Sequence, residues 1–161
     1  MAASVSVIKI KTADEEKIRQ NVALMSGSHV LVGFPQGDPK AQRDEGGMSN
    51  AALAALHNSG SPSQGIPPRP FMDGAFESNS NRDTLRKLAR GLVFRCVRGR
   101  LEPAKALGVI GIAAEGMVKD SIRDGDWIEN AASTIARKES SRPLIDTEQM
   151  LNAVTHKVVS R

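Results

Sequence analysis

The sequence predicts an α+β fold, in which a small and largely antiparallel sheet of about three to four strands packs against helices. Segments 4–11 and 150–159, near the two ends, alternate β-branched and polar residues, the period-two pattern of half-buried strands. Between them, apolar residues recur at helical spacing over 83–98 and again after residue 103. A chain of 161 residues suits one domain, so we expect a single domain over 1–161.

A helix is predicted directly after the first strand. Thr12 matches the first position of a capping box, and Ile18, Val22 and Met25 form an apolar stripe at intervals of about one turn. Gly27 provides the stop. The β-branched run 28–34 then predicts a second strand.

The segment 35–48 combines Gly, Pro and charged residues without periodicity, which predicts a flexible loop that becomes ordered in an assembly. A short Ala/Leu helix is expected over 50–58, capped by Ser49 and ended by Gly60. The Pro-rich segment 61–70 is expected to be non-helical, because a residue that precedes Pro is driven towards extended conformations.

Two long helices are predicted in the second half. The first, 83–98, carries an apolar stripe that comprises Leu85, Leu88, Ala89, Leu92, Val93 and Cys96. The second starts at Pro103 and extends to about residue 123. Gly108, Gly111 and Gly116 inside it suggest the close approach of a neighbouring backbone. The segment 131–144 is polar and irregular before the final strand.

The residue types of catalytic and metal centres do not form recognisable patterns here. The single Cys96 lies on an apolar helix stripe and is interpreted as a small buried hydrophobe. The three His residues have no ligand spacing, and the acidic turn 120–129 only faintly resembles a calcium loop. We therefore expect no catalytic site, cofactor or metal, and an enzyme is the least favoured class. The first apolar stretch is short and followed by charges, so a soluble protein with no membrane partner is expected.

Positive charge is concentrated in one segment. Between residues 82 and 105 there are eight Lys or Arg against two acidic residues, Asp83 and Glu102. Arg82, Arg86 and Arg90 share one helix face, with Lys87 beside them. Such a face could contact nucleic-acid phosphates, although the segment has no Tyr or Trp for base stacking. Contact with another subunit or with solvent is the favoured interpretation.

One pair of motifs is more specific. The string 55–60 (ALHNSG) is followed by Ile66-Pro67-Pro68-Arg69-Pro70-Phe71-Met72, and further along the chain stand Trp127 and Pro143-Leu144-Ile145-Asp146-Thr147. Over roughly residues 28–159 this arrangement resembles a family of tailed-bacteriophage virion-morphogenesis and tail-completion proteins. The family has Thr-Gly where this chain has Thr147-Glu148, and Glu does not readily adopt a positive φ.

The motif residues also have structural roles on physical grounds. The prolines stiffen an extended segment, and Arg69 can direct its planar donor fork to a carboxylate or carbonyl group. Phe71 and Met72 can anchor this segment on the core, and Pro143, Leu144 and Ile145 can hold the chain before the last strand. The motifs either shape the monomer alone or also lie at subunit interfaces, and both interpretations stay open.

The resemblance implies a non-enzymatic structural protein of the head–tail neck, either a tail terminator or a neck adaptor. Its expected location is the virion, after assembly in the host cytoplasm. Its expected partners are further copies of itself in a ring, such as a hexamer or a dodecamer, together with neck, connector and tail-tube proteins near the packaged DNA. The alternative is a DNA-binding accessory protein that uses the basic helix 82–100.

Overall fold

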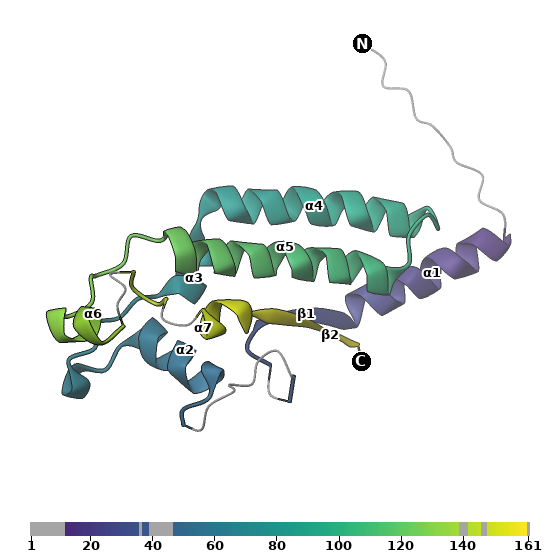
Figure 1. Ribbon diagram of the computed structural model, residues 1–161. Helices are drawn as coiled ribbons and strands as arrows, with labels where there is room; N and C mark the ends of the chain where they lie inside the picture. The colour runs from purple at the N-terminus through teal and green to yellow at the C-terminus, as the bar shows by residue number, and fades with distance from the viewer. Residues whose placement is uncertain (1–11, 36, 39–46, 139–141, 146–147, 161) are drawn as a thin grey trace, which may run out of the picture.

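The computed structural model describes residues 12–35, 37–38, 47–138, 142–145 and 148–160. Within these ranges the chain forms an α+β arrangement (Figure 1). In chain order the elements are α1 (Thr12–Ser26), β1 (Ser28–Gly33), α2 (Asn50–Ser59), the 3₁₀ helix η2 (Pro62–Gln64), α3 (Phe71–Glu77), α4 (Asn79–Val97), α5 (Pro103–Asp124), α6 (Ala132–Lys138), α7 (Gln149–Asn152) and β2 (Thr155–Ser160).

The long helix α5 lies at the centre of the molecule. It packs against both strands and also contacts α1, α3, α4 and α7. Figure 1 shows α4 running alongside α5 on the side away from the strands, while α2 and α6 lie at the end of the molecule opposite α1. The burial of α5 follows from this position, because residues as far apart as Pro103 and Ile122 are buried along it.

The sheet has fewer strands than the sequence suggests. The described residues contain two antiparallel strands, with Ser28 opposite Ser160 and Gly33 opposite Thr155. The expected strand 4–11 lies outside the described residues. At the C-terminus the prediction of a strand over 150–159 is wrong for its first half: Gln149–Asn152 form the short helix α7, and the strand begins at Thr155.

The short helices show the other differences. The segment 131–144, expected to be irregular, contains α6, and the Pro-rich stretch expected to be non-helical contains the single turn η2. The long basic helix begins at Asn79 rather than at residue 83, and the separate helix α3 precedes it. Each of these differences concerns a helix of one or two turns or the first turn of a longer helix. The stability of such short segments comes from tertiary packing more than from the periodicity of their own sequence.

Two apolar clusters form the core. The larger one contains Phe71 and Val118, which are fully buried, and joins α3 and α5 to residues from α7 and the last strand region. The smaller one centres on Leu92, Cys96 and Ala106, where α4 meets α5, and includes the half-buried Met25 of α1. Cys96 is completely buried, as its position on the apolar stripe predicts. Burial raises the pKa of its thiol, which favours the unreactive protonated form.

The first helix buries a different residue from those expected. Met25 packs against the smaller cluster, but Val22 is exposed. The most buried side chain of the helix is instead Asn21, whose Nδ2 donates a hydrogen bond to the carbonyl oxygen of Cys96 at 2.9 Å. A polar contact, rather than the apolar stripe alone, therefore ties α1 to α4.

Candidate functional site: the motif junction and the basic helix face

The first motif forms a tight turn between α2 and α3. The backbones of Ser61 and Ile66 form an isolated antiparallel bridge, with N···O distances of 2.8 and 3.0 Å. At Gly60 the backbone has φ 72°, and a Cβ there would lie 2.7 Å from the backbone nitrogen of Pro68. Only glycine fits this position without a local shift. The turn is closed by a hydrogen bond from the Arg69 amide to the His57 carbonyl at 2.8 Å.

Beyond this turn the chain is anchored on the core, as the sequence predicts. Phe71 is fully buried, and the half-buried Met72 packs against the same cluster. Pro67 is half-buried, whereas Pro70 is exposed and lies at the start of α3. The anchoring role predicted for Phe71 and Met72 is therefore confirmed.

Arg69 connects the first motif to the segment that follows α5. Its side chain is 3 % exposed. Its Nε donates to the carbonyl oxygen of Ile128 at 2.9 Å, and its Nη2 donates to the carbonyl of Glu129 at 3.2 Å and to Oδ1 of Asn130 at 3.1 Å. The predicted donor fork is thus present, and its acceptors are two carbonyls and an amide oxygen. Burial lowers the pKa of the guanidinium from its ordinary value.

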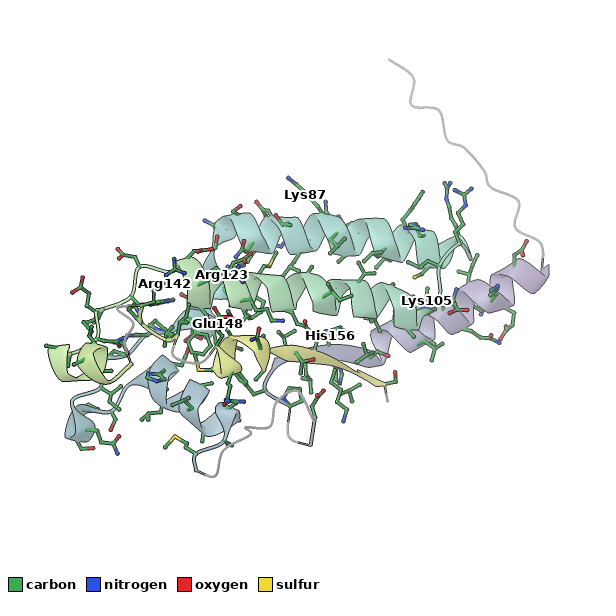
Figure 2. All side chains as sticks on the ribbon, in the orientation of Figure 1. Lys87, Lys105, Arg123, Arg142, Glu148 and His156 are labelled. Carbon is green, nitrogen blue, oxygen red and sulfur yellow. The ribbon has the colours of Figure 1, made fainter. Side chains whose placement is uncertain are left out.

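The same junction reaches the second motif. Nδ2 of Asn130 donates to the carbonyl oxygen of Arg142 at 3.3 Å, so Asn130 lies between Arg69 and the segment that begins at Arg142. Figure 2 labels Arg142 at the end of the molecule where α5 ends. The two halves of the signature, more than 70 residues apart in sequence, therefore meet at one end of the molecule.

The second motif packs into the core where it is described. Leu144 and Ile145 are buried members of the larger cluster, and Pro143 is half-buried beside them. Thr147 lies outside the described residues. Glu148 adopts the left-handed conformation, with φ 59°. The position therefore has the backbone geometry that a glycine provides, although a glutamate occupies it.

Trp127 stabilises the turn after α5. Its Nε1 donates to the carbonyl oxygen of Ser121 at 2.9 Å, and its ring is packed against the larger cluster. A Cβ on Gly125 would lie 2.4 Å from the ring, so the absence of a side chain at Gly125 allows the indole to lie against the helix end. This contact holds residues 128–130 where Arg69 can reach their carbonyl groups.

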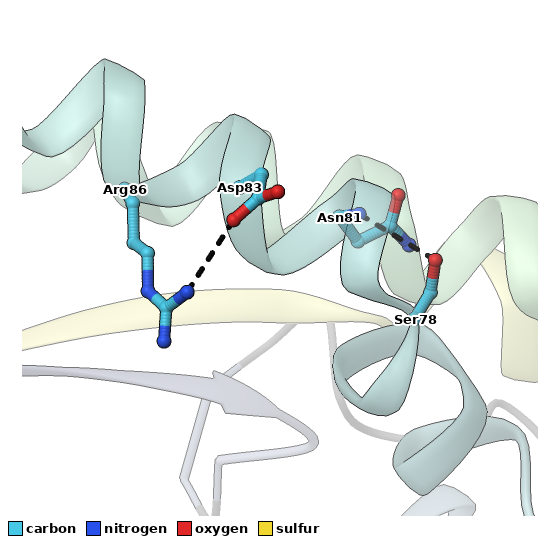
Figure 3. Close-up of polar contacts among 4 residues, drawn as sticks. All are labelled: Ser78, Asn81, Asp83 and Arg86. Carbon is cyan, nitrogen blue, oxygen red and sulfur yellow. Dashed lines mark hydrogen bonds and ion pairs between the residues drawn. The ribbon is translucent and has the colours of Figure 1, made fainter.

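The basic face of α4 is a separate feature. Arg82, Arg86, Lys87 and Arg90 are all exposed. Arg86 forms an ion pair with Asp83 at 3.3 Å, and both side chains are more than 60 % exposed (Figure 3). Such an exposed pair contributes little to stability. Lys87 points away from α5 (Figure 2). Within the described residues, Arg82, Lys87 and Arg90 have no ion-pair partner.

The polar contact between α5 and β2 was not predicted from the sequence. The Nδ1 of His156 lies 2.5 Å from Oε1 of Glu115, whose Oε2 is 3.7 Å from the Nζ of Lys119. A Cβ on Gly111 would lie 2.1 Å from the imidazole ring, so the glycine makes room for a side chain and not for a backbone as expected. At Gly108 and Gly116 an added Cβ would meet nothing within 4 Å, so those two positions do not show the expected close approach.

In the ranges that the structure describes, no group of three or more His, Cys, Asp or Glu side chains lies close enough together to hold a metal ion. No helix in those ranges combines the length and the apolar character required to cross a bilayer.

Comparison with known proteins identifies no relative: no protein-family model, curated protein or solved structure matches this chain.

Proposed function

We propose that this protein is a structural component of a tailed-phage neck, acting as a ring-forming subunit at the joint between head and tail. One observation carries the proposal. Arg69 of the first half of the family-like signature hydrogen bonds to Asn130, and Asn130 in turn donates to Arg142, which directly precedes the described residues 143–145 of the second half. The two halves therefore contribute to one structural feature of the fold, and this supports reading them as a combined motif.

The exposed surface supports an assembly role. Val22 and Leu24 on α1 and Phe94 on α4 are each about half exposed, at 48 %, 52 % and 55 %. Single exposed apolar residues are common on monomers, but here they lie on the two helices that also carry the basic face and the projecting end of the molecule. A ring built from repeated head-to-tail contacts would cover such residues.

The proposal is tested by removing the gene from the phage that carries it. DNA-filled heads and finished tails should accumulate unjoined, and complementation with the wild-type gene should restore complete particles. An Arg69→Met gene should complement poorly, whereas an Arg19→Met gene, which alters an exposed arginine on α1, should complement fully. Normal particles in the absence of the gene would contradict the neck assignment.

A second candidate function is nucleic-acid binding by the basic face of α4. It is favoured by the exposure of Arg82, Lys87 and Arg90 without ion-pair partners in the described residues. If this face binds DNA, replacing Arg82, Arg86 and Arg90 by Ala should abolish binding, and affinity should fall steeply with salt. Asp83→Asn is the matched control: it releases Arg86 from its ion pair and should strengthen binding. Equal DNA affinity of the wild-type protein, the triple Ala variant and the Asp83→Asn variant would exclude this function.

A further inference from the structure

The outer edge of β1 has no partner strand in the part of the chain that the structure describes. The sheet there consists of β1 and β2, so among the described residues each strand pairs with another strand on one side only. Proteins commonly protect such edges with charged residues or proline. β2 carries the exposed Lys157 in its centre, whereas β1, with the sequence SHVLVG, contains neither a charge of fixed sign nor a proline. β1 is therefore the edge that is open to a further strand.

The side chains of β1 lead to the same conclusion. Val30 and Val32 are half-buried, and their partners across the sheet are Val158 and His156, the latter in contact with α5. Leu31 points to the opposite face and is 53 % exposed. An added strand beside β1 would cover part of Leu31 and pair with the backbone of β1.

The chain contains one other segment with the composition of a strand. Residues 4–11 (SVSVIKIK) include Val5, Val7, Ile8 and Ile10, with neither glycine nor proline. β-branched residues of this kind are enriched in strands. The segment precedes α1 directly, so the geometry of α1 determines which edge it can reach.

The position of α1 limits how far along β1 of the same chain a segment that precedes α1 could pair. α1 has 15 residues and meets β1 at its C-terminal end through Gly27. In Figure 1 it projects beyond the α4–α5 pair, with its N-terminal end farthest from the strands. A helix of this length spans about 22 Å. Eight extended residues span about 27 Å, so a segment that doubled back along α1 would reach only the start of β1.

We propose that the β1 edge of one copy takes residues 4–11 of a second copy as an added strand. This contact is head-to-tail, since the donor segment and the acceptor edge are different surfaces, and contacts of that kind form a ring when the rotation between subunits closes. The strand contributes backbone hydrogen bonds, and its β-branched side chains pack beside Leu31. The inference deepens the proposed ring-forming function and rests on it.

The test is disulfide formation between two distinguishable copies. One copy carries Leu31→Cys and the other, with a larger tag, carries Cys at position 5, 7, 8 or 10 in turn; native Cys96 is fully buried and remains in both. At least one position should give the mixed, tagged dimer on mild oxidation, because cross-strand neighbours have Cβ atoms about 5 Å apart. Each copy alone, with its engineered cysteine and Cys96, is the control for reaction through Cys96.

Three outcomes would overturn the inference. The first is no mixed dimer at any of the four positions. The second is a disulfide within one chain when both cysteines are placed on it. The third is efficient crosslinking to Lys157→Cys instead of Leu31→Cys, which would show that the added strand lies beside β2. The neck location is tested independently, by experiments on phage particles. Failure of the strand contact and failure of the proposed function are therefore distinguishable.

A backbone variant provides an independent measurement. Val7→Pro removes an amide donor from the added strand and should weaken self-association at least tenfold, as measured by mass photometry over a concentration series. Ala2→Pro lies outside the segment and should leave association unchanged. Both proteins should keep the wild-type circular dichroism spectrum and melting temperature. Equal association of the two variants would contradict the proposal.

Discussion

Arg69 is the residue on which the junction of the two motifs depends. Its three hydrogen bonds fix the segment after α5 to the turn before α3, and its guanidinium is almost completely removed from water. Because a planar fork makes these contacts, lysine cannot replace it. Its donor role could be predicted from the sequence, but its acceptors could not, since they lie about 60 residues further along the chain.

We expect Arg69→Met to lower the free energy of unfolding by about 2 kcal/mol, since hydrogen bonds to a charged group are lost and the carbonyls of Ile128 and Glu129 lose their partner. Urea denaturation measures the change. Arg19→Met, which removes an ion pair whose arginine is 72 % exposed, should change stability by less than about 0.5 kcal/mol. Similar effects for the two variants would show that the junction contributes nothing beyond surface charge.

At Glu148 we predict a substitution that raises the free energy of unfolding. A non-glycine residue in the left-handed region costs about 1 kcal/mol, and Glu148 is exposed, so its side chain has no buried contact to lose. Replacing it with glycine should raise the free energy of unfolding by about 0.5 kcal/mol, after the larger chain entropy of glycine in the unfolded state is included. Thermal denaturation checks this, and Gln149→Gly, inside α7, should be destabilising instead.

Among the elements, α5 shows where a sequence pattern is sufficient and where it is not. Its extent follows from Pro103 at the start and from the spacing of Leu107, Ala114 and Val118, all of which are buried. Its three internal glycines look equivalent in sequence. Only the arrangement of α5 against β2 distinguishes Gly111, which faces the His156 ring, from Gly108 and Gly116.

These glycines give a matched set of variants. Gly108→Ala and Gly116→Ala should each stabilise the protein by about 0.5 to 1 kcal/mol, because alanine favours the helix and an added Cβ meets nothing there. Gly111→Ala should destabilise it by at least about 1 kcal/mol, because the methyl group would overlap an imidazole held by Glu115. Chemical denaturation of the three proteins side by side decides the point. Stabilisation by Gly111→Ala would mean that His156 moves aside freely.

The short elements were the least predictable. α7 begins directly after the left-handed Glu148, and its apolar residues Met150 and Leu151 are buried on the core rather than in the sheet. An apolar run of this length fits a strand or a helical turn equally well, so only tertiary packing decides. α6 was equally hard to predict, because its sequence lacks a strong apolar stripe. A helix of two turns is too short for a periodic pattern of apolar residues to be recognised.

At the scale of the whole molecule, a small antiparallel sheet with helices was predictable, because segment 28–34 and the end of segment 150–159 have strand patterns, whereas the middle of the chain has helical periodicity. The number of strands was not: two are present in the described residues, and 4–11 lies outside them. The proximity of the two motifs could not be derived from spacing either, since it requires α5 to place residue 130 beside Arg69.

The central claim, that the protein is part of a tailed-phage neck, concerns the assembled particle. Its most direct test is labelling of purified virions with an antibody to this chain, viewed by electron microscopy. Our proposal predicts that the antibody labels the head–tail joint. It also predicts that mass spectrometry of the particles detects the protein at the copy number of a ring. Particles that lack the protein, or that carry it only elsewhere, would contradict the claim.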